Sequence, residues 1–426
     1  MIERLLRQLS AVNWDFPGLN PDVTSAIHWY PGTFPAQMPA ALVEALSGKG
    51  DMVFDPYGGI GTTAVEAVRL GRKAWTVDIN PVACLSAYVL GGLLLLKTGR
   101  QVDISGLFAV IQDAVLHRNG QDKWLGLAGL EAAQKSSNLL DQTIRPRPQA
   151  MLNIMITHMP AQWSLLQKWF EPATLSQVKR LLTRIVETEM PPFSSLIALT
   201  MLSAVLRASC SQTRSYGHVA DNCFPKVFTY KELGSLCRHW LGRTASVVAR
   251  VRTDTLDSTQ YRGVRFWVTM HDWAVAISSL TPRPGNKSKL LVTSPPYANA
   301  IDYTRGQRLS LYLLGYDDDA IATLGSHEIG ARRKRFHADS EKRWAQDLSQ
   351  AMVAQLNLVD DEGIIALVLP HKDHGREAGS AGLKSILIEY GWKCIFTTPR
   401  SIRQFRTRHS WTSIKRETIE IYQKNG

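Results

Sequence analysis

Residues 51–81 read DMVFDPYGGIGTTAVEAVRLGRKAWTVDINP, and this stretch decides the fold. Apolar residues 52–54 predict a short buried strand, and residues 55–61 predict a tight, glycine-rich loop. A helical run over 62–70 follows at once, and residues 73–77 predict a second buried strand. A strand, a tight turn, a helix and a second strand in this order are typical of a βαβ unit in a parallel sheet.

The loop and the end of the second strand carry residues that suit a ligand. Gly59 and Gly61 let the backbone turn sharply and let a ligand approach closely. Asp78 ends the second strand, where an acid suits hydrogen bonds to ribose hydroxyls in the crevice beyond the strand ends. Taken alone, the pattern leaves two other interpretations open. Residues 59–64 also satisfy the G-x-G-x-x-G/A fingerprint of nicotinamide and flavin sites, and such a turn can be purely structural.

The rest of the chain divides by texture. Strands separated by helices return after residue 263 and predict a parallel α/β sheet, with RFWVTM, KLLVTS, GIIALVLP and KCIFTT as its buried strands. Between the two strand-bearing parts, residues 99–262 are expected to be largely helical, because LFAVIQDAVL and LSQVKRLLTRIVE repeat apolar residues every three or four positions.

Composition narrows the class of protein. The 49 Lys and Arg exceed the 37 Asp and Glu, for a formal charge of +12, which favours a polyanionic partner or serves solubility alone. The five cysteines have no paired CxxC spacing, so we expect reduced thiols and no metal site. The N-terminus does not resemble a secretory signal, and the longest apolar run, 88–96, is far below the roughly 20 residues of a membrane span. We therefore expect a cytoplasmic protein with no membrane partner.

A second motif follows the predicted strand at residues 289–292. Thr293 leads directly into Ser294, Pro295, Pro296 and Tyr297. Two prolines lack the N–H donors of a strand ladder, so they fix a rigid exit and leave carbonyls to face a ligand. Ser294 and Tyr297 flank this turn with a hydroxyl and an aromatic face.

The two loops together resemble those of the DNA amino-methyltransferases. That family pairs a DPFxGxGTT cofactor loop with a (D/N/S)PP(Y/F) catalytic loop, and this chain has DPYGGIGTT at 55–63 and SPPY at 294–297. Tyr57 replaces the usual Phe, a mild departure. The serine form, here as TSPPY, is similar to the cytosine-N4 branch, whereas acidic and Asn forms are more typical of adenine N6.

Two further segments carry the resemblance, which covers about residues 20–100 and 265–375. HWYPGTFP at 28–35 is similar to the family's segment at the methionine end of the cofactor, and AIDYTRGQRLSLYLLGY at 300–316 is similar to methyltransferases of the TSPPY type. The resemblance implies a Rossmann-like methyltransferase fold, a doubly wound and mostly parallel sheet with a large helical insertion. It divides the chain into 1–98 (lead-in and cofactor half), 99–262 (insertion, expected to recognise the target or to act as a scaffold) and 263–426 (catalytic half).

The activity implied is transfer of a methyl group from S-adenosylmethionine to the exocyclic N4 of cytosine in duplex DNA, with base flipping. Adenine-N6 methylation, an RNA base methyltransferase and a catalytically idle DNA-binding module remain alternatives. Double-stranded DNA is the expected partner, and the resemblance allows for a cognate restriction endonuclease. Such an enzyme is expected at the nucleoid of a bacterial cytoplasm.

The resemblance also assigns site residues. The catalytic loop is Ser294, Pro295, Pro296 and Tyr297. The residues expected to bind the cofactor are His28, Tyr30, Asp55, Tyr57, Gly59, Gly61, Thr62, Asp78, Asp272 and Trp273. Plain packing is the alternative for His28 and Tyr30, and a helix N-cap is the alternative for Asp272.

Basic residues near the catalytic loop and the C-terminus are expected to hold phosphates, with a solvated charged face as the alternative. They are Arg305, Arg308, Arg332, Arg333, Lys334, Arg335, Arg403, Arg406 and Arg408.

Overall fold

A computed structural model describes most of the chain. The described residues are 2–17, 27–33, 35–98, 104–116, 127–212, 224–253, 263–298, 300–336, 339–371, 377–402 and 416–424.

One eight-stranded sheet organises the molecule, in the order β3-β4-β2-β1-β5-β6-β8-β7. Neighbouring strands are parallel except at β8, which runs antiparallel to both β6 and β7. The strands are β1 (Met52–Asp55), β2 (Lys73–Asp78), β3 (Ile144–Arg145), β4 (Phe266–Met270), β5 (Ser288–Thr293), β6 (Val359–Pro370), β7 (Trp392–Ser401) and β8 (Arg416–Lys424).

The direction of winding reverses between β1 and β5. From β1 the chain passes outward to β2, then to β3 at the edge and back to β4 between them. It returns to β5 on the other side of β1, where Phe54 pairs with Leu291. Crossovers on opposite sides leave a crevice at the carboxyl ends of these two strands, which is where open α/β sheets bind ligands. The predicted doubly wound, Rossmann-like methyltransferase fold is confirmed by this strand order, and both motif loops begin at the crevice.

Helices cover both faces of the centre of the sheet, so β1, β2 and β5 are buried at almost every position. The predicted buried strand KCIFTT is instead half-buried or exposed, because it belongs to β7 at the edge of the sheet. Along β1, Val53 packs with the core beneath one set of helices and Phe54 with the core beneath the other. The first set is α3 (Gln37–Leu46), α4 (Thr62–Arg69) and α5 (Pro81–Thr98), and the second is α16 (Ser340–Leu356) and α17 (Glu377–Glu389). The short helix α1 (Ile2–Ser10) packs beside α3.

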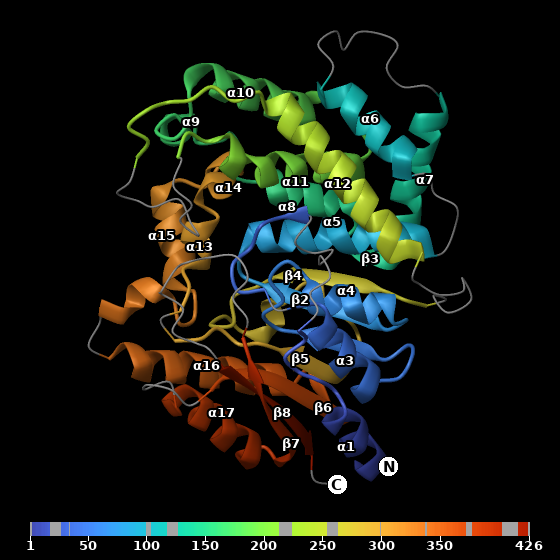
Figure 1. Cartoon of the computed structure of the whole chain (residues 1–426), viewed down its shortest axis with the longest axis vertical. Helices are drawn as coiled ribbons and strands as arrows, with labels where there is room; N and C mark the ends of the chain where they lie inside the picture. The colour runs from blue at the N-terminus through green and yellow to red at the C-terminus, as the bar shows by residue number, and fades with distance from the viewer. Residues whose placement is uncertain are drawn as a thin grey trace.

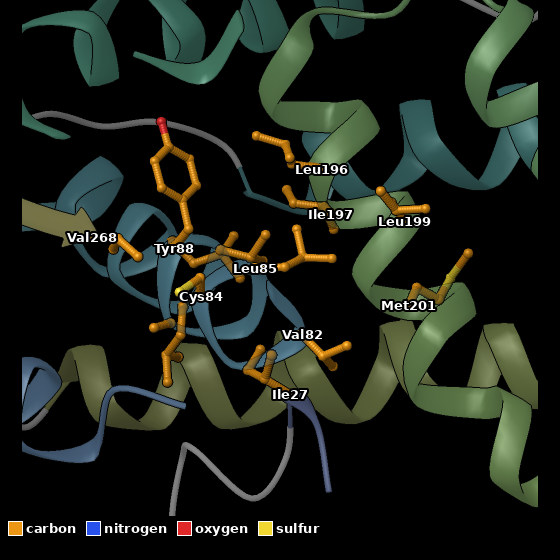
Figure 2. Close-up of a cluster of buried hydrophobic side chains, with 14 of the residues drawn as sticks. Ile27, Val82, Cys84, Leu85, Tyr88, Leu196, Ile197, Leu199, Met201 and Val268 are labelled. Carbon is orange, nitrogen blue, oxygen red and sulfur yellow. The ribbon is translucent and has the colours of Figure 1, made fainter. Parts of the chain in front are cut away.

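A helical layer lies beyond α5, at the upper end of the molecule in Figure 1. Its described elements are α6 (Ile104–Leu116), α7 (Leu127–Thr143), α8 (Pro148–Ile156), α9 (Trp163–Leu166), α10 (Pro172–Glu187), α11 (Pro192–Ser209) and α12 (Leu233–Thr253). Figure 2 shows Leu85 and Tyr88 of α5 beside Leu196 and Ile197 of α11, with Val268 of β4 nearby. Helix α5 therefore joins the helical layer to the sheet. Helix α11 is long and apolar enough to cross a membrane, but 78% of it is buried inside the molecule.

Short helices after the catalytic loop connect the sheet to this layer. They are α13 (Tyr303–Gly306), α14 (Arg308–Leu313), α15 (Asp318–Ser326) and the 3-10 turn η3 (Arg332–Phe336). Gln162 fastens them to the helical layer, because its backbone N–H donates to the Tyr312 carbonyl at 2.9 Å and its side-chain amide donates to the Gly315 carbonyl at 2.8 Å.

We predict that Gly315→Ala lowers the free energy of unfolding by about 2 to 4 kcal/mol, through backbone strain and a clash at this junction. Gly315 has a φ of +96°, and a Cβ there would lie 1.9 Å from the His158 carbonyl oxygen. Urea unfolding would measure the change. The control is Gly242→Ala in α12, where a Cβ meets nothing within 4 Å and is expected to stabilise the helix. Equal stability of Gly315→Ala and wild type would contradict the docked geometry.

Candidate active site

A hydrogen bond between side chains joins the two motif loops. The Thr293 hydroxyl, at the end of β5, donates to Asp55 Oδ1, at the end of β1, at 2.7 Å. The same Asp55 oxygen accepts the Tyr57 backbone N–H at 3.1 Å. Asp55 is buried at the switch point, so this carboxylate fixes the start of the glycine loop relative to the start of the SPPY turn.

Asp78 holds the other side of the glycine loop. Its Oδ2 accepts the Gly59 N–H at 2.9 Å and its Oδ1 accepts the Asn80 N–H at 2.8 Å. Gly59 and Gly61 both have positive φ values, 53° and 86°, which side chains rarely adopt. The sequence prediction of a sharply turned loop next to Asp78 is borne out, while its ribose contact stays a prediction. Thr62 is buried at the start of α4.

The two acids form a negative site in which Asp55 is buried and Asp78 is half-buried. Burial raises the pKa of Asp55 from 3.8 to about 6, against hydrogen bonds that lower it. Burial likewise raises the pKa of Asp78 from 3.8 to about 6, and the charge of Asp55 adds to that rise. Among the described residues, neither carboxylate has a lysine or arginine that offsets its charge. Two such acids favour a cationic ligand.

Two residues whose backbones bind Asp78 carry unpaired side-chain atoms. The side-chain nitrogen of Asn80 and Nε2 of His271 are buried and have no hydrogen-bond partner within the described part of the chain. The His271 backbone N–H donates to the Asp78 carbonyl at 3.0 Å, so the end of β4 lies beside the end of β2. The site thus offers carboxylates, an amide donor and an imidazole. This donor set fits S-adenosylmethionine, which carries an ammonium, a sulfonium, ribose hydroxyls and an adenine ring.

The segment at residues 27–33 reaches the glycine loop, with different outcomes for its two predicted residues. Tyr30 lies over Gly59, where a Cβ would be 3.4 Å from its ring, and stacks on Tyr303 with centroids 5.6 Å apart. His28 instead packs against α11, since its Nδ1 donates to the Trp29 carbonyl at 2.8 Å and its Nε2 accepts the Ser203 hydroxyl at 2.9 Å. Burial lowers the pKa of His28 to about 4. Tyr30 thus lies at the glycine loop and His28 packs against α11, and cofactor contact by either residue stays a prediction.

The turn after β4 braces the glycine loop from the opposite face of the sheet. Trp273 Nε1 donates to the Pro56 carbonyl at 2.8 Å, and its ring packs edge-on against Tyr57 at 6.5 Å. Asp272 accepts the Ala274 N–H at 2.9 Å and hydrogen-bonds His327. The sequence AVAISSL forms only a short 3-10 turn, η2 (Ile277–Ser279), so Asp272 caps a turn rather than an α-helix. Cofactor contact by Asp272 and Trp273 stays a prediction.

The catalytic loop is held at both ends. The Pro296 carbonyl accepts Trp344 Nε1 of α16 at 2.9 Å. The Ser294 hydroxyl donates to Tyr297 Oη at 3.0 Å, and Tyr297 Oη lies 2.9 Å from Glu417 Oε1 and 3.1 Å from the Val368 carbonyl. Pro295 itself is buried between these contacts.

The predicted basic residues lie in different surroundings. Arg305 and Arg308 are half-buried on α13 and α14. Arg333 faces inward, and its guanidinium lies against Gly325, 3.8 Å from the buried Glu328 carboxylate. The backbone N–H of Arg333 donates to Asp302 Oδ1 at 2.9 Å.

Arg332 and Lys334 are half-buried beside Arg333 in η3, and burial lowers the pKa of Lys334. The side chain of Arg335 and all of Arg403, Arg406 and Arg408 lie outside the described residues.

Sequence reasoning missed the residues that support the loops from a distance. Trp344 and Glu417 carry no local motif, and Glu417 is 120 positions from its partner Tyr297. Tyr303 lies within the quoted segment 300–316, but sequence reasoning assigned it no role of its own. Thr293 had a signal, because it completes the TSPPY spelling.

We predict that Asp55→Asn becomes more stable relative to wild type as pH rises from about 4 to 6. A raised pKa means that folded Asp55 binds its proton more tightly than unfolded Asp55, so the wild-type free energy of unfolding falls through this window and then levels. The Asn oxygen can still accept from Thr293 and Tyr57. Urea unfolding at several pH values, without ligand, measures the difference, and a difference that does not change with pH would contradict the buried-charge assignment.

Comparisons with known proteins match the part of the chain that contains the glycine loop. Residues 6–88, which include the glycine loop and Asp78, match the N6_N4_Mtase family model, described as DNA methylase. The type II methyltransferase M.MjaII of Methanocaldococcus jannaschii is 20% identical over 393 residues, covering 81% of this chain and 72% of that protein.

Two solved structures align with most of this chain at low identity. TrmN from Thermus thermophilus aligns over 94% of this chain and 52% of its own, with 9% identity and a TM-score of 0.32, so the chain spans about half the length of TrmN. The rRNA methyltransferase aviRa from Streptomyces viridochromogenes aligns over 97% of this chain and 94% of its own, with 11% identity and a TM-score of 0.33. Scores of this size carry no argument about function. The family match and the M.MjaII relative support a DNA amino-methyltransferase.

Proposed function

We propose that this protein transfers a methyl group from S-adenosylmethionine to the exocyclic N4 of cytosine in duplex DNA, after the base has been flipped out of the helix. One observation carries the proposal: the Thr293 hydroxyl binds Asp55, which places the SPPY turn against the glycine loop at the switch point of the sheet. A donor held by one loop and a base held by the other would meet there.

The chemistry of the amino group explains the SPPY turn. The nitrogen lone pair of cytosine N4 is delocalised into the ring, so the nitrogen attacks poorly unless acceptors draw its protons out of the ring plane. The Ser294 hydroxyl donates a hydrogen bond to Tyr297 Oη. The lone pairs of Ser294 Oγ are then left to accept a hydrogen bond from one amino proton. The Pro295 carbonyl, next to Ser294 in the same turn, would accept the other. The Tyr297 ring, fixed through its hydroxyl, offers a face on which the flipped base stacks.

The electrostatics of the glycine loop favour this donor over a dinucleotide. The pyrophosphate of a nicotinamide or flavin cofactor would approach the loop beside Asp55 and Asp78, whose raised pKa values already reflect poorly solvated negative charge. The sulfonium and ammonium of S-adenosylmethionine would relieve that cost. When bound, this cofactor supplies an electrophilic methyl group.

The serine form of the loop favours N4 of cytosine, and N6 of adenine is the second candidate because both bases present the same amino geometry. For the DNA itself, we assign target recognition to the helical layer within 99–262. Phosphate contacts are assigned to the half-buried Arg305 and Arg308 near the catalytic loop.

Weighing the modified nucleosides decides among the alternatives. Plasmid DNA and total RNA are incubated with the protein and labelled cofactor, digested, and separated by mass. N4-methylcytosine in DNA supports the proposal, N6-methyladenine moves the activity to the second candidate, and label confined to RNA overturns the choice of DNA.

We predict that Pro295→Ala and Tyr297→Ala each reduce methyl transfer at least about 100-fold while cofactor affinity is retained. The changes disturb only the base side of the site, where a small misplacement is costly. Calorimetry with S-adenosylhomocysteine checks binding, and Tyr390→Ala, an exposed tyrosine at the end of α17, is the matched control. Loss of cofactor binding in both loop variants would contradict the division of roles between the loops.

A further inference from the structure

A buried chain of hydrogen bonds runs from the catalytic loop into the last two strands. Arg400 Nη1 binds Glu417 Oε2 at 3.0 Å, Glu417 Oε1 lies 2.9 Å from Tyr297 Oη, and Ser294 Oγ lies 3.0 Å from Tyr297 Oη. We propose that Glu417, backed by Arg400, is a positioning residue that fixes the direction of these hydrogen bonds and so keeps the Ser294 hydroxyl as an acceptor toward the base. This inference rests on the proposed methyl transfer.

The sheet register explains why these residues lie close enough to form a continuous series of hydrogen bonds. Arg400 of β7 and Glu417 of β8 are paired across an antiparallel ladder, so their side chains lie on the same face. Glu417 is also paired with Pro370 at the end of β6, the strand whose Val368 carbonyl contacts Tyr297. The antiparallel strand therefore delivers a carboxylate to the carboxyl edge of the sheet, behind the catalytic loop.

Burial gives this carboxylate its influence. Glu417 is 9% exposed and Arg400 is 5% exposed, so water does little to satisfy either charge. A buried carboxylate needs donors at both oxygens. Arg400 serves one oxygen, and the Tyr297 hydroxyl is the donor placed at the other.

Donor counting then fixes the direction of each bond. A phenol has one proton, and Arg400 can only donate, so ionised Glu417 takes the Tyr297 proton in preference to the neutral Val368 carbonyl. Tyr297 Oη is then only an acceptor toward Ser294, and the Ser294 hydroxyl must donate to it. The lone pairs of Ser294 are left for an exocyclic amino group. Without the charge of Glu417, Tyr297 is free to donate to Ser294 and this preference is lost.

A double-mutant cycle with Glu417→Gln and Tyr297→Phe tests this series of hydrogen bonds. We expect each single change to lower kcat about 10-fold or more with little change in KM for DNA or cofactor, because the Tyr297 ring and the pocket remain. Since Glu417 acts only through the Tyr297 hydroxyl, the double variant should be no slower than Tyr297→Phe alone. Multiplied effects, or wild-type kcat in Glu417→Gln, would overturn the proposal.

The control for general damage is Glu420→Gln. Glu420 is another buried acid of β8 that binds a tyrosine, Tyr422, and a cation, Lys384, at 2.6 Å, but it lies away from the catalytic loop. Its variant should lose stability as Glu417→Gln does and keep kcat. If Glu417→Gln does not fold, Glu417→Asp retains the charge, moves the carboxylate away from Tyr297, and carries the same cycle.

A second readout separates this inference from the proposed function. Protein labelled with 13C at the tyrosine ζ carbon reports hydrogen bonding at Tyr297, whose signal is assigned by its loss in Tyr297→Phe. The signal should shift in Glu417→Gln and stay in place in Glu420→Gln, with or without methyl transfer activity. An unmoved Tyr297 signal in Glu417→Gln would refute the proposed hydrogen bonding between Glu417 and Tyr297. A shift of the signal without any methylated nucleic acid would refute only the proposed function.

Discussion

The hydrogen bond from Thr293 to Asp55 is the constraint on which the rest of the site depends. It closes the gap between two strands that lie 238 residues apart in sequence and next to each other in the sheet. Because β1 and β5 are the strands at which the winding reverses, no crossover helix blocks the crevice beyond them. The glycine loop and the SPPY turn therefore leave the same edge of the sheet as a result of strand order, and the 2.7 Å contact fixes their spacing.

The same carboxylate shows how the fold prepares for its ligand at a cost in stability. Asp55 is buried and Asp78 is half-buried near it, and loss of solvation raises the pKa of each to about 6. The carboxylate oxygens of each acid accept hydrogen bonds from backbone or hydroxyl donors of the loops. These bonds fix the loop conformation but do not neutralise the charge. A cationic donor would complete the balance, so the loop conformation and the choice of ligand have the same electrostatic origin.

Local pattern predicted the central part of the fold well. The run from β1 through α4 to β2 follows from residues 51–81, and the strands before both motif loops end where their spelling indicates. The local sequence pattern could not predict contacts between residues that only tertiary packing brings together. Trp344, which binds the Pro296 carbonyl, is one of many apolar residues on α16. Arg333 belongs to a run of basic residues typical of a phosphate contact, yet its guanidinium turns inward toward Glu328. Only the packed chain distinguishes such cases.

Glu417 of the antiparallel strand β8 restricts which residue can stand at position 294, because both side chains bind the Tyr297 hydroxyl. With serine at 294, one phenol proton suffices, because serine donates to Tyr297 and Tyr297 donates to Glu417. An acid at position 294 could not donate when ionised, so two carboxylates would compete for that one proton and repel each other in a buried place. The serine form of the loop and the buried Glu417–Arg400 pair are therefore mutually dependent. A chain with an acid at 294 would need a different, uncharged or donating neighbour behind its aromatic residue.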